Sequence, residues 1–165
     1  MHSLEVVTFP PAPGTYALIL ACLREKRLRI GKLGEIHLQP GYFVYLGSAF
    51  GPGGLAARLS HHRRPIVRPH WHIDYLRPAT VLTEIWFTCD PSSREHLWAD
   101  LIAHIKHGFI LLPGFGSTDC TCRSHLFFLR DRPSIQLFRR LIRARIPSHG
   151  KVFRHIVELP AANRS

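Results

Sequence analysis

One segment organises this chain: Pro40-Gly-Tyr-Phe-Val-Tyr-Leu-Gly-Ser-Ala-Phe-Gly-Pro-Gly-Gly-Leu-Ala-Ala-Arg-Leu-Ser-His-His62. Its first part, residues 42–46, is aromatic and β-branched, which is typical of a strand, and Gly47 ends that run. Further on, Leu55 and Leu59 lie four residues apart, as on one face of a helix over about residues 53–64. The segment therefore predicts a strand, a glycine turn and a helix.

The turn between this strand and this helix has the composition of an anion site. Four glycines bracket it: Gly47, Gly51, Gly53 and Gly54. A strand that runs through glycines into a helix start leaves backbone N–H groups free at one point. Arg58 lies one turn into the helix, and His61 and His62 follow on the same face. We therefore expect a phosphate to bind at this turn.

Hydrophobic periodicity predicts the other elements. Residues 14–23 read as a buried strand that turns Tyr16, Leu18 and Leu20 to one side. The remaining elements are a hairpin at 24–39, a strand or helix at 70–76, a strand at 81–88, a helix from an N-cap at Ser92 or Ser93 to Gly108, a strand ending at 126–129 and a helix at 134–146. The pattern predicts an α/β (α+β) domain, with a small mixed or antiparallel sheet flanked by helices.

The charge of the chain points to a polyanionic partner. The sequence has 22 Lys and Arg against 11 Asp and Glu, a net charge of +11. Residues 1–129 carry 13 basic and 9 acidic side chains, a net +4, and residues 130–165 carry 9 and 2, a net +7. Such a surplus favours nucleic acid, and an acidic membrane surface is a weaker alternative. A basic surface that is only solvated is the remaining alternative.

The cysteines and the apolar runs indicate the compartment. Only two of the four cysteines are close together, Cys120 and Cys122, and this C-x-C spacing is poor for a disulfide framework. The first residues lack a basic-then-apolar signal sequence, and no apolar run approaches the length of a membrane span. We therefore expect a cytoplasmic protein with no membrane partner.

Two half-motifs and an arginine fall in order along the chain. Gly14-Thr15-Tyr16 opens the first strand, Tyr45-Leu46-Gly47 ends the strand at 42–46, and Arg58 follows in the helix. This arrangement resembles the GIY-YIG nuclease superfamily. Longer signatures look like one uncharacterised prokaryotic branch of it: Gly53-Gly54-Leu55, His70–Leu76 and Phe115–Phe127. The resemblance covers about residues 13–129. It divides the chain into an extended lead-in (1–13), a GIY-YIG-like domain (14–129) and a basic C-terminal extension (130–165).

The resemblance implies a metal-dependent nuclease that hydrolyses phosphodiester bonds, in DNA more than in RNA. Tyr16 or Tyr45 would take the proton of the attacking water. A phenol has a pKa of about 10, which a nearby cation and a metal ion would lower. Arg58 would hold the scissile phosphate with its planar fork. His62, or its neighbour His61, would assist as a second proton carrier or phosphate donor.

The resemblance also implies a single divalent ion, Mg²⁺ or Mn²⁺. Superfamily members hold it with one glutamate on the helix after the third strand, which here falls on Glu95. A lone carboxylate that leaves most waters on the ion fits Mg²⁺ chemistry. Asp100 and Glu84 are the rival carboxylates.

A histidine-rich segment and the C-x-C pair leave three roles open: the lining of a substrate cleft, a zinc site, and a structural role such as a buried histidine tied to Asp74 or Asp119. In a strand, His70, His72 and Asp74 would project to one face, and we expect His70 and His72 to line the substrate cleft together with Gly47 and Gly54. The weaker alternative is a zinc site, in a zinc-stabilised interaction domain. Its ligands would come from Cys120, Cys122 and His125 with His70 or His72.

Two departures from the superfamily pattern keep a second function open. The chain has an insert between Tyr16 and Tyr45. If the insert is an extra hairpin in the same sheet, the tyrosines remain neighbours, and if it is not, we expect them not to share a site. Ser48 stands where members often have a lysine. The alternative function is a nucleic-acid-binding module without catalysis. In either case we expect the basic face of the 134–146 helix, with Arg139 and Arg140, to contact a nucleic-acid backbone.

Overall fold

The fold is built on a five-stranded antiparallel sheet, with the strands in the order β6-β4-β1-β5-β7. The computed structural model describes residues 8–105, 109–117 and 122–158. The strands of this sheet are β1 (Thr15–Cys22), β4 (Gly41–Ser48), β5 (Val81–Thr88), β6 (Leu126–Leu129) and β7 (Val152–Ile156). A second sheet has two strands, β2 (Lys26–Ile30) and β3 (Gly34–Leu38). The predicted α+β class is confirmed.

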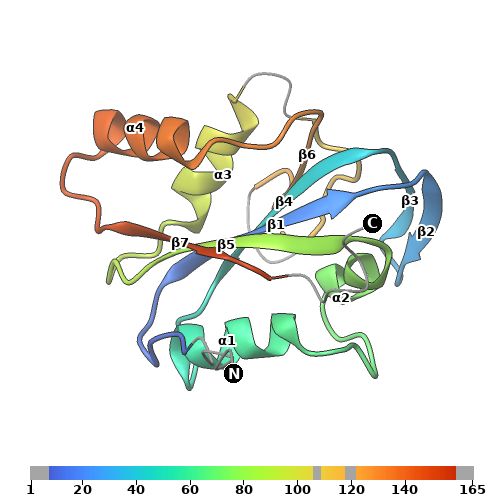
Figure 1. The fold of residues 1–165 in the computed structure, drawn as a ribbon, viewed down its shortest axis with the longest axis horizontal. Coiled ribbons are helices and arrows are strands. Elements are labelled where there is room, and N and C mark those ends of the chain that lie inside the picture. The colour runs from blue at the N-terminus through green and yellow to red at the C-terminus, as the bar shows by residue number, and fades with distance from the viewer. Residues whose placement is uncertain (1–7, 106–108, 118–121, 159–165) are drawn as a thin grey trace, which may run out of the picture.

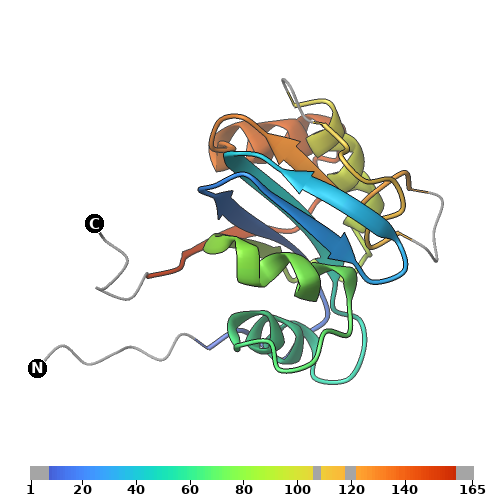
Figure 2. The same ribbon diagram turned by 90° about the vertical axis from the view of Figure 1, so that its right-hand side faces the viewer.

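Helices cover both faces of the main sheet (Figure 1). On one face lie α1 (Gly54–Arg63) and α2 (His72–Leu76), and on the other lie α3 (Glu95–Ala103) and α4 (Ile135–Arg145). Figure 2 shows the same layers after a quarter turn. A short 3₁₀ turn, η1 (Arg77–Ala79), follows α2. Within the described ranges, no helix combines the length and the apolar character that crossing a membrane requires.

The central strand β1 serves two hydrophobic cores, and all of its residues are buried. Tyr16, Leu18 and Leu20 pack toward α1 and α2, whereas Ala17 and Ile19 pack toward α3 and α4. The alternation arises because successive side chains of a strand point to opposite faces. The predicted orientation of Tyr16, Leu18 and Leu20 is confirmed.

The insert between the two half-motifs is a hairpin that forms its own two-stranded sheet and does not join the main one. The ladder between β1 and β4 ends at the pair Cys22 and Gly41, and β2 begins at Lys26. The insert therefore lengthens a hairpin without separating its two long strands. As a result β1 and β4 pair directly and Tyr16 lies opposite Gly47. The expectation that the tyrosines share a site only if the hairpin joins the main sheet is therefore wrong.

The start of α1 differs from the prediction of a phosphate-binding turn. The N–H of Leu55 donates to the carbonyl of Ala12 at 2.9 Å, and the N–H of Ala56 donates to the carbonyl of Pro10 at 3.0 Å. Gly54 has φ +55°, and a Cβ there would lie 2.4 Å from the Ala12 oxygen. The lead-in segment thus occupies the helix start, and the prediction that its N–H groups are free is wrong.

The sequence left the type of one other element undecided and predicted the wrong start for another. Residues 72–76 form the short helix α2, so His70, His72 and Asp74 do not share a strand face. The helix α3 begins at Glu95 after Arg94, which lacks a side-chain cap, so the predicted serine N-cap is wrong. Instead the Arg94 N–H donates to Thr15 Oγ1 at 3.0 Å. The helix ends at Ala103, with His104 as its C-cap, so the prediction that it runs on to about His107 is wrong.

The basic region after residue 130 completes the same sheet and core. Ser134 caps α4 by accepting a hydrogen bond from the N–H of Leu137. Three residues of that helix, Ile135, Phe138 and Ile142, pack in the same hydrophobic core as α3. β7 pairs with β5 as an edge strand. The described part of this region is therefore structurally continuous with the domain and does not stand apart from it.

A buried carboxylate, Glu84, joins β5 to β7. Its side chain accepts hydrogen bonds from Trp86 Nε1 at 2.8 Å and from two nitrogens of Arg154 at 2.9 and 2.8 Å, and Arg132 lies 3.2 Å away. Burial alone would raise the pKa of Glu84, but the hydrogen bonds from Arg154 and Trp86 hold it below its usual value. The residue is therefore ionised in the fold.

We expect Glu84→Gln to destabilise the fold by about 3 kcal/mol, because it leaves the Arg154 and Arg132 charges beside a buried neutral amide. Urea unfolding at pH 7 measures this difference. Glu35→Gln is the matched control, since its exposed pair with Arg27 at 3.9 Å should contribute less than about 1 kcal/mol. Equal losses in the two variants would contradict the role of Glu84.

Candidate active site

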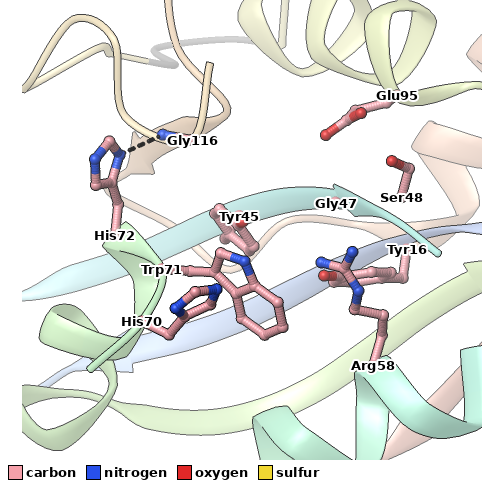
Figure 3. A pocket seen from close by; sticks show the side chains of 10 residues that line it. All are labelled: Tyr16, Tyr45, Gly47, Ser48, Arg58, His70, Trp71, His72, Glu95 and Gly116. Carbon is pink, nitrogen blue, oxygen red and sulfur yellow. Dashed lines mark hydrogen bonds between the residues drawn. The ribbon is translucent and has the colours of Figure 1, made fainter. Parts of the chain in front are cut away.

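A cleft of about 360 Å³ opens where β1 begins and β4 ends. Its lining comes from segments that are far apart in the sequence (Figure 3). The lining residues are Tyr16, Tyr45, Gly47, Ser48, Arg58, His70, Trp71, His72, Glu95 and Gly116. The cleft thus contains both tyrosines, the arginine and the glutamate that the sequence singled out. It also contains His70, His72 and Gly47, whereas Gly54 lies elsewhere, against the lead-in segment.

Gly47 makes room for the Tyr16 side chain. The two residues are cross-strand partners, and a Cβ built on Gly47 would lie 2.4 Å from both the Cζ and the hydroxyl oxygen of Tyr16. No side chain larger than hydrogen fits this space without moving the phenol. The second half-motif therefore needs its glycine for steric reasons, because the ring of the first half-motif lies across it.

Behind Tyr16 lies a buried histidine. The Tyr16 hydroxyl is 2.7 Å from His62 Nε2, and both side chains are almost completely buried. Burial, assisted by the charge of Arg77, lowers the pKa of His62 to about 3, so the imidazole is neutral at physiological pH. Its Nδ1 has no hydrogen-bond partner in the described part of the chain.

Tyr16 itself is a phenol and not a phenolate. Burial raises the pKa of Tyr16 well above its usual value, and the neighbouring Tyr45 acts in the same direction. The charge of Arg58 acts the opposite way but does not prevail. Arg58 alone therefore does not lower the pKa of Tyr16, and the expectation that a cation together with a metal ion lowers the pKa of one of the tyrosines stays a prediction.

Arg58 extends from α1 into the cleft. Its guanidinium lies over the indole ring of Trp71, with Cζ 4.5 Å from the ring centroid. Figure 3 shows its nitrogens between the Trp71 ring and Tyr16, on the side that faces Glu95 across the cleft. A guanidinium stacked on an aromatic face keeps its N–H edge directed outward, as an anion-binding group requires.

One buried carboxylate, Asp74, fixes the histidine-rich wall of the cleft. Its Oδ2 accepts the N–H groups of His70 and Trp71 at 2.9 and 3.0 Å, and its Oδ1 lies 3.2 Å from His61 Nε2. Burial alone would raise the pKa of Asp74, but the backbone hydrogen bonds from Trp71 and His70 lower it below its usual value. The carboxylate is therefore charged and holds the wall in place.

His72 joins this wall to the 109–117 loop. Its Nδ1 accepts the N–H of Gly116 at 2.9 Å (Figure 3), which requires the neutral ring. Burial lowers the pKa of His72, in agreement with that role. Gly116, in turn, has φ +66°, and a Cβ there would approach Tyr45 Cε2 to 3.1 Å. His72 therefore positions the 109–117 loop at one end of the cleft.

Glu95 enters the cleft from the first turn of α3. The bond from the Arg94 N–H to Thr15 Oγ1 fixes this helix start beside β1, one residue from Tyr16. Glu95 Oε1 lies 3.0 Å from Nδ1 of the buried His125. The chemistry of this carboxylate, in a polar cleft that has room for water, fits a single hydrated Mg²⁺ or Mn²⁺.

The rival carboxylates lie elsewhere. Glu84 is held in the arginine network between β5 and β7, and Asp100 pairs with Arg145 at 3.1 Å on the outer side of α3. Neither lines the cleft. Among the residues described, no group of three or more His, Cys, Asp and Glu is arranged to hold a metal ion.

The residues considered for zinc are dispersed. Cys122 Sγ lies 3.1 Å from His96 Nδ1, and His125 faces Glu95. His70 and His72 line the cleft, and Cys120, like Asp119, lies outside the described residues. The described members of the predicted zinc set therefore have other neighbours.

The basic face of α4 lies away from the cleft. Nε and Nη2 of Arg139 donate to the carbonyl of Val152 at 3.1 and 2.7 Å, which ties α4 to β7. Arg140 is exposed on the same helix. Because α4 covers the face of the sheet opposite α1, these two arginines do not join the predicted substrate residues of the cleft.

Two residues of the site escaped sequence reasoning. Trp71 stacks on Arg58, and its position next to His70 and His72 gave no signal of that contact. His125 was a candidate for the cleft lining and, as the weaker alternative, for a zinc site, but its approach to Glu95 was not predicted. Both contacts depend on long-range packing, which periodicity does not reveal.

We expect Gly47→Ala to displace the Tyr16 ring and to destabilise the fold by about 1–3 kcal/mol, as overpacked sites do. Urea unfolding measures the stability, and a crystal structure of the variant shows the ring. Gly51→Ala is the control, because a Cβ there meets nothing within 4 Å. An unmoved Tyr16 in the Gly47 variant would contradict the steric account.

We expect His62 to make stability depend on pH below 6.5. Its pKa is 6.5 when exposed and about 3 in the fold, so the unfolded chain binds the extra proton. His62 therefore does not lower the free energy of unfolding above pH 6.5. Below that pH, proton uptake by His62 in the unfolded chain lowers it toward pH 3, by up to about 1.4 kcal/mol per pH unit. His62→Gln should reduce this slope in urea unfolding between pH 6.5 and 4.5. Leu59→Ala should lower stability without changing the slope, and parallel slopes for wild type and His62→Gln would contradict the assignment.

Comparison with known proteins identifies one family. The sequence matches the family described as "Domain of unknown function DUF123" over residues 15–146, which includes every element from β1 to α4. Neither the curated proteins nor the solved structures contain a match. The matched range holds all the side chains that line the cleft. The chain belongs to the DUF123 family.

Proposed function

We propose that this protein is a metal-dependent nuclease that hydrolyses phosphodiester bonds in nucleic acid, with DNA as the preferred substrate. The observation that carries the proposal is convergence. Tyr16, Arg58 and Glu95 come from a strand and two helices on opposite faces of the sheet, yet they line one cleft with Tyr45. Such a set supplies an anion clamp, a metal-binding carboxylate and phenols that can position the attacking water.

Arg58 is the phosphate clamp in this proposal. Its guanidinium lies over the Trp71 ring and faces the carboxylate of Glu95 across the cleft. The cleft volume of about 360 Å³ has room for a phosphate and a hydrated ion. A planar fork binds two phosphate oxygens, and its charge stabilises the negative charge that develops in the transition state. The net charge of +11 favours the same class of substrate.

Tyr16 and His62 position the attacking water in this proposal. The Tyr16 hydroxyl donates its hydrogen bond to the neutral His62 Nε2, 2.7 Å away, so the phenol oxygen can accept a hydrogen bond from the water. The water oxygen bonds to phosphorus as its proton passes to solvent, the P–O bond to the leaving group breaks, and solvent protonates the leaving oxygen. The raised pKa of Tyr16 agrees with this role, because the phenol stays protonated while it holds the water. Tyr45 positions the water from the other side.

Glu95 is the metal ligand in this proposal, and its carboxylate faces His125. When bound, Mg²⁺ or Mn²⁺ would offset charge on the phosphate and promote ionisation of water. A cytoplasmic location, which the cysteine pattern led us to expect, agrees with a nucleic-acid substrate.

A nucleic-acid-binding module without catalysis is the second candidate. Two observations favour it: Ser48 lines the cleft where superfamily members often have a lysine, and the pKa of Tyr16 is raised and not lowered. Binding and cleavage must therefore be measured separately.

We expect cleavage of labelled DNA that requires Mg²⁺ or Mn²⁺ and falls at least about 100-fold in Tyr16→Phe, Arg58→Ala and Glu95→Gln, the range seen when a positioned catalytic group is removed. The substrates are single-stranded, duplex and branched DNA and RNA, incubated with purified full-length protein. Tyr75→Phe, Arg143→Gln and Asp100→Asn are the matched controls, since none of these residues lines the cleft.

Binding of the same DNA, measured with EDTA present, separates the two candidates. Metal-dependent cleavage that is lost only in the cleft variants supports the nuclease. Binding without cleavage supports the module. Cleavage that persists in Glu95→Gln and Arg58→Ala would overturn the assignment of the site.

A further inference from the structure

The segment from Arg58 to Arg77 is the most basic surface near the cleft. It carries five arginines and four histidines against a single carboxylate, Asp74. That carboxylate is completely buried and occupied by His61 and the backbone of His70 and Trp71. The positive charge of the segment is therefore not neutralised by an exposed acid within it.

The middle of this segment exposes an aliphatic side chain. We call residues 64–69 (Arg-Pro-Ile-Val-Arg-Pro) the apex loop, which swings outward between α1 and α2 (Figure 1). Val67 is 97% exposed, more than the other large hydrophobic residues of the described chain. Arg64 and Arg68, both exposed, flank it. Exposed apolar residues are common on protein surfaces, but this one stands among arginines, where a polyanion would approach.

Both ends of the apex loop are held. The carbonyl of Arg64 accepts a hydrogen bond from Arg77 Nη2 at 2.8 Å, and the Arg64 N–H donates to the carbonyl of His61 at 3.2 Å. At the other end Asp74 holds the N–H groups of His70 and Trp71. Pro65 and Pro69 restrict the backbone between these ends. The loop therefore presents Val67 from a fixed base.

The apex loop is adjacent to the cleft. His70, which follows it directly, lines the cleft with Trp71. Two residues lie between Val67 and His70, so the Cα atoms of Val67 and His70 are at most about 10 Å apart. This length corresponds to about three base steps of DNA. A nucleic acid whose phosphate lies at Arg58 would therefore pass the apex within a few base steps.

We propose that the apex loop is a wedge for nucleic acid: Val67 packs between neighbouring bases while Arg64 and Arg68 bind the flanking phosphates. The proposal rests on the proposed function for its substrate class and adds a mode of recognition to it. An apolar side chain that enters a base step unstacks it and bends the duplex, and arginines beside it neutralise the backbone. The wedge selects DNA that opens easily, at a bend, nick or branch, over regular duplex.

The test measures unstacking without cleavage. Full-length protein is added, in EDTA, to a set of short duplexes with a central nick, each carrying one 2-aminopurine at a different step beside it. At saturating protein we expect fluorescence to rise at one or two adjacent steps. Val67→Ser should lose at least about three quarters of that rise with less than a threefold loss of affinity. Leu23→Ser, another exposed aliphatic residue (72%), is the control and should keep the rise.

The arginines are tested by salt dependence. Arg64→Gln with Arg68→Gln should weaken binding about tenfold and reduce the salt slope by about 2, since each phosphate contact contributes about 0.9. At saturation this variant should still raise the fluorescence, because Val67 is intact. A fluorescence rise that Val67→Ser retains, no rise at saturation, or binding to phosphatidylserine vesicles and not to DNA would each overturn the proposal.

The outcomes separate the wedge from the nuclease. Because the fluorescence assay contains no divalent ion, loss of the proposed nuclease activity would not affect it. Conversely, cleavage that depends on the cleft residues, combined with unchanged fluorescence, would remove the wedge and leave the nuclease.

Discussion

The pairing of β1 with β4 is the constraint on which the site depends. It sets Tyr16 opposite Gly47, and the phenol occupies the space that a Cβ at Gly47 would need. Because strand side chains alternate between faces, a slip of one residue would turn Tyr16 into the core of α3 and α4 and bring Ala17 to the cleft. The register thus fixes the chemical identity of the cleft floor, and the helices on both faces stabilise that register by burying opposite sides of the same strand.

Around this floor, buried polar groups position the two long side chains of the proposed site, Arg58 and Glu95. Asp74 fixes the wall that carries Trp71, and Trp71 supports the guanidinium of Arg58. Thr15 Oγ1 accepts a hydrogen bond from the N–H of Arg94, the residue before Glu95, and His125 faces the Glu95 carboxylate. Each group therefore has a partner that is itself anchored in backbone structure. Such support allows an arginine and a glutamate, both flexible residues, to face each other across a narrow cleft.

The sequence predicted the elements whose signal is local and repeated. β1, β4, α1 and α4 follow from apolar spacing that a short window reveals. The α1 start was misread because the carbonyls that occupy it come from Pro10 and Ala12, more than forty residues earlier. α2 has five residues, which is too short for a period to distinguish helix from strand. The resemblance to the GIY-YIG superfamily indicated Tyr16, Tyr45, Arg58 and Glu95 as residues of one site, but the positions of Trp71, His125 and Arg139 required tertiary structure.

The inserted hairpin has a consequence for how such chains can vary. β2 and β3 lie beyond the last pair of the β1–β4 ladder, and they form a sheet of their own. Pairs of residues can be added or removed there while the strands of the main sheet keep their register. A change of length between residues 23 and 40 therefore leaves the main sheet in register, provided that Ile30, Ile36 and Leu38 still fill the core, whereas a single deletion within residues 15–22 or 41–48 would exchange the two faces of the sheet. Length variation should thus gather in the hairpin and be rare in the strands beside the cleft.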